Sequence, residues 1–126
     1  MLEWLAQQLA SLGQALRPLP SAVPLSILQA DERQLVIQGN AAVFCFDSRQ
    51  RCVRVGMRRK AAFDDIRCVI VQHHRDSDDR PEHWSVTLQV RGFLADVHLG
   101  WSQDDVDASI LGARLARFLG KPVRAW

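Results

Sequence analysis

The sequence predicts a mainly β protein that begins with an amphipathic helix and ends with a second helix. Four short runs between residues 25 and 56 (LSILQA, RQLVIQ, AVFCFD and RCVRVG) are rich in β-forming residues, and three more follow between residues 66 and 99. Period-two alternation bounded by turn residues is typical of strands. Most connections are shorter than a parallel crossover requires, so we expect seven antiparallel strands.

The first 24 residues differ from the rest of the chain. Residues 1–17 carry one apolar stripe at helical spacing, formed by Leu2, Leu5, Leu9, Leu12 and Leu16. Three prolines then make residues 18–24 an extended connector, because proline disfavours helix at and just before itself. Residues 25–126 are long enough to form one folded domain with its own core.

The leucine stripe of the N-terminal helix needs something to cover it. Its polar face is glutamine, serine and alanine rather than lysine and arginine, which disfavours a helix lying on a membrane. The stripe could pack on the chain's own domain, pair with a second copy in a homodimer, or dock on a partner. The five leucines are therefore the candidate residues of an oligomer or partner helix.

The C-terminal helix is expected over residues 104–119. Ser102 is the expected N-cap, and Asp105 can return its hydrogen bond. Gly120 ends the helix, and Pro122 prevents its resumption. Its apolar face is formed by Ala108, Leu111, Leu115, Phe118 and Leu119.

Composition indicates an ordinary globular protein. Apolar residues make up 48% and charged residues 24%, and a net charge of +2 is too small to imply nucleic acid. The three cysteines form no CxxC pair, which argues against a disulfide framework or a zinc ribbon. No convincing signal peptide or membrane-spanning run is present, so we expect a cytoplasmic protein, with the inner face of the membrane as an alternative location.

The stretch from residue 73 to residue 83 looks most like a chemical site. It contains His73, His74, Asp76, Asp78, Asp79, Glu82 and His83. Adjacent histidines on a strand point to opposite faces, so His73 and His74 cannot easily share a metal ion. We therefore expect a solvated hairpin loop with no metal and no catalytic residue. A small metal-dependent enzyme that uses this loop is the remote alternative.

The basic run RQRCVRVGMRRK, residues 49–60, holds six positive side chains and no acid. Charge on a strand edge also discourages aggregation, which is the simplest explanation of the run. The alternative is a surface for an anion or a partner. Its candidate residues are Arg54, Arg58, Arg59 and Lys60. Headgroup phosphates are favoured over nucleic acid, because single-stranded nucleic acid requires exposed aromatic rings for stacking.

Three segments resemble the bacterial pleckstrin-homology-like (PH-like) domains. They are AAFDDIRCVIV (61–71), HWSVTLQVRGFLADVHLG (83–100) and DASILGARLARFLGKPV (107–123). The resemblance implies a seven-stranded antiparallel bent sheet or barrel capped by the C-terminal helix. It also implies a binding module without shared catalytic residues. The loop that binds phosphoinositides in some members would here be the acidic ADER, so that site is not carried over.

Together these observations predict a non-catalytic interaction module without a cofactor, which binds a protein partner or itself. The alternative is a peripheral membrane adaptor that meets anionic lipid headgroups through residues 49–60. Nucleic acid is disfavoured as a partner. The motifs GxSxG, HExxH and the P-loop do not occur, so nothing in the sequence favours an enzyme.

Overall fold

Two sheets and one long helix form the part of the protein that the structure describes. The computed structural model describes residues 23–92 and 95–126. The first sheet contains, in spatial order, β1 (Ser26–Ala30), β2 (Gln34–Gln38), β3 (Val43–Asp47), β4 (Cys52–Val55) and β5 (Arg58–Ala62). The second contains β8 (Val97–Ser102), β7 (His83–Val90), β6 (Ile66–His74) and β9 (Val123–Ala125). The short 3-10 helix η1 (Phe63–Asp65) joins β5 to β6, and α2 (Asp105–Leu119) lies between β8 and β9.

The first sheet is an antiparallel meander in which every strand pairs with its neighbours in the sequence. Alternate residues of its central strands face the core, including Leu35 and Ile37 on β2 and Phe44 and Phe46 on β3. The residues between them are only half-buried. One face of this sheet is therefore available for contacts outside the core.

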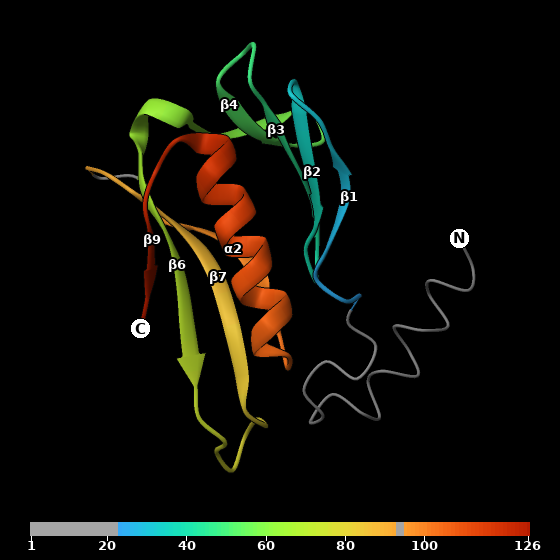
Figure 1. Ribbon diagram of the computed structural model, residues 1–126, viewed down its shortest axis with the longest axis vertical. Helices are drawn as coiled ribbons and strands as arrows, with labels where there is room; N and C mark the ends of the chain where they lie inside the picture. Colours follow the sequence, from blue (N-terminus) through green and yellow to red (C-terminus); the bar gives the residue numbers. More distant parts are fainter. Residues whose placement is uncertain (1–22, 93–94) are drawn as a thin grey trace.

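The second sheet is mixed. Its strands β6, β7 and β8 are antiparallel, whereas β9 returns after α2 and pairs parallel to β6. Helix α2 covers one face of β6 and β7, and β1 of the first sheet lies beside the helix (Figure 1). A Cβ atom on Gly112 of α2 would lie 2.6 Å from Cγ2 of Val71, so the glycine lets the helix lie close to the sheet.

The ends of α2 only partly follow the prediction. Gly120 ends the helix in the left-handed conformation, with φ of 69°, as predicted. The N-cap is Asp104 rather than Ser102: the side chain of Asp104 accepts a hydrogen bond from the N–H of Val106. The side chain of Ser102 instead accepts a hydrogen bond from the N–H of Asp104, which precedes the helix. The prediction of Ser102 as N-cap is therefore wrong.

The predicted single seven-stranded bent sheet or barrel is also wrong. Residues 23–92 and 95–126 contain nine strands in two sheets, and these do not form a closed barrel. The two additional strands are β5, which lies within the basic run, and β9, which follows Pro122. Strand β5 has no apolar alternation because its first three residues are exposed and charged. Strand β9 is held by β6 rather than by any pattern of its own.

The last of the three strands expected between residues 66 and 99 corresponds to β8. Residues 93 and 94 lie outside the described part, Ala95 is exposed, and β8 begins at Val97. The side chain of Asp96 accepts a hydrogen bond from the N–H of Val90, with a distance of 3.0 Å. This contact satisfies a backbone donor at the end of β7, where the strand ladder stops.

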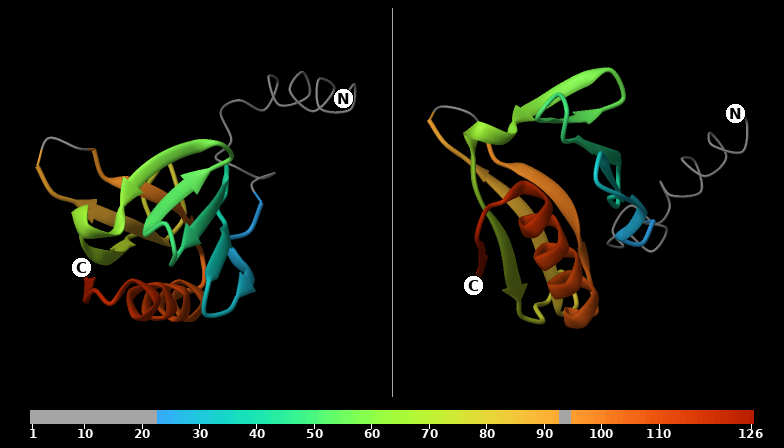
Figure 2. Two further views of the ribbon diagram at one scale, coloured as in Figure 1. Left: turned by 90° about the horizontal axis from the view of Figure 1, so that it is seen from above. Right: turned by 45° about the horizontal axis from the view of Figure 1, so that its top comes forward.

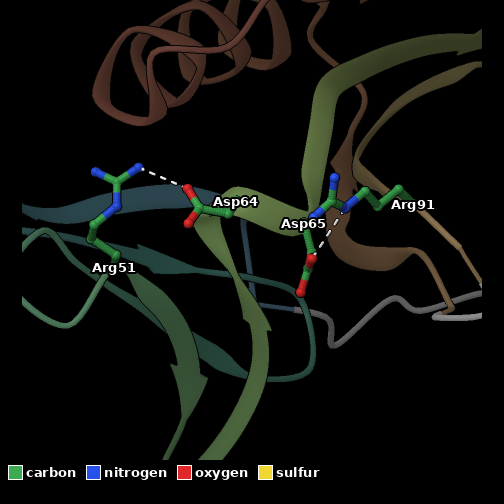
Figure 3. Close-up of polar contacts among 4 residues, drawn as sticks. All are labelled: Arg51, Asp64, Asp65 and Arg91. Carbon is green, nitrogen blue, oxygen red and sulfur yellow. Dashed lines mark hydrogen bonds and ion pairs between the residues drawn. The ribbon is translucent and has the colours of Figure 1, made fainter.

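The chain passes from the first sheet to the second at η1. The ring of Phe63 is buried between Phe46 of the first sheet and Phe118 of α2, with centroids 6.5 and 6.2 Å away. Two ion pairs flank this ring: Arg51 contacts Asp64, and Arg91 after β7 contacts Asp65, each at 3.2 Å (Figure 3). Both pairs are largely exposed and contribute little, so the buried ring is the stronger connection.

A polar contact joins the two sheets at another point. Asn40, in the turn between β2 and β3, bonds both backbone groups of Trp101 on β8. Its Oδ1 accepts from the N–H of Trp101 at 2.6 Å, and its Nδ2 donates to the carbonyl oxygen at 3.2 Å. The turn from β2 to β3 thus lies against β8.

We predict that Phe63→Ala lowers the free energy of unfolding by about 3–5 kcal/mol, because it leaves a cavity between Phe46 of the first sheet and Phe118 of α2. Urea unfolding followed by circular dichroism measures the change. The matched control is Met57→Ala, which truncates a side chain that is 96% exposed and should change stability by less than about 0.5 kcal/mol. Equal effects of the two substitutions would contradict this account of the core.

Candidate functional site

The structure divides the basic run at residues 49–60 into two groups. Arg51, in the turn between β3 and β4, pairs with Asp64. Arg49 lines a surface hollow together with Asp47. The four predicted binding residues lie instead around the β4–β5 hairpin. Of the basic side chains in the run, those at the hairpin therefore have fewer acids nearby.

The four predicted residues surround the hairpin and do not share one face. Arg54 on β4 lies directly opposite Arg59 on β5, so both point to the face away from the core. Arg58 pairs with Val55 at the end of the hairpin and points to the other face. Lys60 is the extra residue of a β-bulge in β5. Positive charge is thus present on both faces of this hairpin.

Arg54 is the most buried of the four, and its surroundings are distinct. Its cross-strand neighbour on β3 is Cys45, and its Nε has no hydrogen-bond partner among the described residues. The N–H of Gln50 does most to lower the pKa of Asp47, and the charge of Arg54 adds to this effect. Burial raises the pKa of the Cys45 thiol, and Asp47 raises it further, so this thiol stays protonated at neutral pH.

The adjacent histidines at the end of β6 point to opposite faces, as predicted. His73 Nε2 lies 2.6 Å from Glu82 Oε2, and its ring stacks on Trp84 with centroids 4.7 Å apart. His74 Nε2 lies 2.8 Å from Ser85 Oγ on the other face. In the described ranges, no three side chains of metal-ligating type come together.

The face of the second sheet away from α2 carries an open polar groove of about 560 Å³. Its lining includes His74, His83, His98, Arg80 and Trp101. The rings of His74 and His83 stack with centroids 4.5 Å apart. His83 Nδ1 lies 3.0 Å from the carbonyl oxygen of Pro81, which can only accept, so Nδ1 carries the proton.

The polar groups of this groove interact mainly with one another. His98 Nδ1 lies 3.1 Å from Thr87 Oγ1, and the guanidinium of Arg80 lies over the ring of Trp101 at 5.2 Å. Burial lowers the pKa of His74, and electrostatic interaction with His83 and Arg80 lowers it further. His98 is exposed on β8 and lies beside Thr87 of β7.

A second surface lies between β1 and α2. One hollow of about 250 Å³ is lined by Leu25, Ser26, Ile27, Asp107, Ile110 and Leu111. Another, of about 400 Å³, is lined by Ala30, Asp31, Leu35, Arg114, Arg117 and Phe118. The first is mainly apolar and the second carries two arginines. We call the two hollows together the β1–α2 groove.

A weak sequence signal for this groove exists. Val106 and Ile110 lie outside the apolar face expected for the helix, and both are more than half exposed, at 57% and 52%. Single exposed apolar residues are common and carry no meaning alone. In the folded chain, Ile110 lies beside Ile27 of β1, and both side chains line the apolar hollow of the β1–α2 groove.

Other predicted features are not placed. Leu2, Leu5, Leu9, Leu12 and Leu16 lie outside the described residues, as does almost all of the connector at 18–24. Among the helices that are described, none has the length and apolar character needed to cross a membrane. Comparison of the chain with family models, curated proteins and solved structures gives no significant match. The candidate surfaces therefore stand on their own geometry.

We predict that the stability of the protein falls as the pH is lowered from about 7.5 to about 5 partly because of His74. Its pKa is lowered in the folded state, so the unfolded chain binds the proton more readily. The stabilisation is present above the ordinary value of 6.5 and is lost as the pH falls through the lower, folded value. Thermal unfolding should show that His74→Asn loses less stability than the wild-type protein over this pH range.

The control for this prediction is His98→Asn, which removes an imidazole from β8 and leaves the stacked pair of His74 and His83 in place. It shows how much of the change follows from losing any histidine on this face. An identical pH dependence in the wild-type protein and His74→Asn would contradict the prediction.

Proposed function

We propose that this protein is a non-catalytic binding module that takes up a short, extended segment of a partner protein in the β1–α2 groove. The observation that carries the proposal is the juxtaposition of an open strand edge with a groove that is apolar at one end and basic at the other. The resemblance to bacterial PH-like domains supports a binding role and remains part of the proposal.

Strand β1 offers backbone groups for pairing. It is an edge strand of the first sheet, and within the described part of the chain no strand pairs with its outer side. Four of its five residues are exposed. An added strand would gain main-chain hydrogen bonds there, and its side chains would select for sequence.

The bulge in β1 limits what can bind. Leu28 is the extra residue between the pairs formed by Ile27 and Gln29, and its side chain is 56% exposed. A bulge on an edge strand interrupts regular pairing and discourages open-ended association of sheets. The edge therefore suits a short segment, and the two hollows must supply most of the specificity.

The groove also indicates the chemistry of its occupant. Near Ile27 and Ile110 it favours an apolar side chain. At the other end, Arg114 and Arg117 favour a carboxylate, although Asp31 offsets part of their charge. We therefore expect a segment that carries an apolar residue and, a few positions away, an acidic residue.

Selection from a displayed library of random peptides tests the proposal. Binders of the full chain should be enriched in apolar and acidic residues, and their affinity is measured by fluorescence polarisation. Ile110→Glu should weaken the selected peptide by about tenfold or more, because it places a charge in the apolar hollow. N-methylation of alternate backbone amides in the peptide should also weaken binding, since it removes strand donors.

Ser109→Glu is the matched control, because it adds the same charge to an exposed position of the same helix outside the groove lining. It should leave the affinity unchanged. Peptides that bind equally well to Ile110→Glu, or a selection that returns no binder, would reject the groove as the site.

A further inference from the structure

We infer that the tip of the β4–β5 hairpin docks on an anionic lipid membrane, with Met57 inserted among the lipids and basic residues against the phosphates. This inference is independent of the proposed function, because it concerns the opposite edge of the first sheet. The strand order places β1 at one edge and β5 at the other. In the right-hand view of Figure 2, the hairpin is the topmost part of the protein and its turn lies far from α2.

The first observation is the position of Met57. Val55 pairs with Arg58, so Gly56 and Met57 form a two-residue turn. Gly56 has φ of 61°, the positive value that glycine supplies at the first position of a type II′ turn. The Met57 side chain is 96% exposed, the highest value among the exposed large apolar residues of the described chain. The turn thus presents a long, flexible apolar side chain at its outermost point.

The second observation is the charge around that tip. Arg58, Arg59 and Lys60 are exposed, and within residues 23–92 and 95–126 no carboxylate forms an ion pair with them. The sequence from residue 48 to residue 63 contains no acid. Each basic residue near an anionic membrane surface contributes about 1 kcal/mol of attraction.

The third observation distinguishes insertion by the tip from docking of one flat face. Arg59 and Arg58 lie on opposite faces of the hairpin. On a flat surface, only one of these faces could meet an anion. A hairpin that enters the headgroup layer end-on has phosphates on both sides, so basic residues on both faces are used. This arrangement therefore favours a membrane over a flat, acidic protein surface.

An RNA partner fits the tip less well. Single strands are bound mainly by bases stacking on aromatic rings next to basic residues. The residues of this hairpin include no aromatic side chain: the tip carries methionine, which suits the acyl region of a membrane. Apolar insertion and charge attraction are additive contributions to membrane binding, and both are present here.

Sedimentation of the full chain with vesicles tests the inference. The vesicles contain either phosphatidylcholine alone or phosphatidylcholine with phosphatidylglycerol, at about 50 mM and about 500 mM salt. Binding is expected only to the anionic vesicles and should fall sharply at the higher salt. Arg58→Glu/Arg59→Glu should reduce binding by about tenfold or more. Met57→Ser should reduce it by about three- to tenfold and leave its salt dependence unchanged.

The matched control is Arg75→Glu/Arg124→Glu, which changes the net charge of the protein by the same amount at two exposed positions, one directly after β6 and one on β9. It should retain most of the binding. Loss of binding in the control equal to that in Arg58→Glu/Arg59→Glu would show attraction by net charge alone and overturn the inference.

Insertion is measured separately with Met57→Trp. Its fluorescence, after subtraction of the wild-type spectrum, should shift to shorter wavelength when anionic vesicles are added. No shift, or no effect of Met57→Ser on sedimentation, would overturn the insertion of the tip. If a few millimolar inorganic phosphate displaced the protein from the vesicles, the basic residues would instead form a binding site for a free anion. Tighter binding to single-stranded RNA than to anionic vesicles would assign a nucleic-acid surface.

Discussion

The arrangement of this protein depends on how the chain turns from one sheet into the other at Phe63. A chain of this size could continue the first sheet beyond β5, but the buried ring directs the next strand away. Burial of a phenylalanine contributes several kcal/mol, whereas the two exposed ion pairs beside it contribute at most about 1 kcal/mol each. The aromatic contacts to Phe46 and Phe118 therefore hold the first sheet against the helix, and the ion pairs orient η1 within that arrangement.

This turn also explains why the first sheet has two free edges. Strand β5 ends where the chain leaves for the second sheet, and β1 has no earlier strand beside it in the described residues. Each edge is then modified differently. The outer strand β5 carries three charged residues and a bulge, and β1 carries a bulge and lies beside α2. Because the edges lie on opposite sides of one sheet, a ligand at one would leave the other accessible.

Much of the secondary structure could be predicted from local chemistry, and most of the sheet architecture could not. The strands with apolar alternation and the helix that ends at Gly120 are all present. The sequence does not predict β5, because its residues are charged and do not alternate with apolar ones. Pairing with β4 is what makes them a strand. Strand β9 was missed because three residues after a proline carry no periodic pattern, and only β6 makes them a strand. The division into two sheets depends on Phe63, whose burial among distant rings is not visible in its own segment.

The candidate surfaces show the same limit. The sequence identified Arg58, Arg59 and Lys60 because charge clustering is local, and it correctly separated the imidazoles of His73 and His74 because strand geometry is local. It did not identify Met57 as a tip residue, since the turn follows from the pairing of Val55 with Arg58. The β1–α2 groove combines residues from β1 and α2, so no single segment could give the residues that line it.

The parallel pairing of β9 with β6 has a consequence for how the chain folds as it is made. Each strand of the first sheet pairs with one just synthesised, so this sheet can form as soon as it leaves the ribosome. Strand β6 is different, because one of its edges is covered only by residues 123–125. Until residues 123–125 have left the ribosome, that edge stays open beside Cys68, Val69, Ile70 and Val71, which are all buried in the folded structure. Pairing of residues 123–125 with β6 therefore removes an aggregation hazard that the strands made before them do not remove.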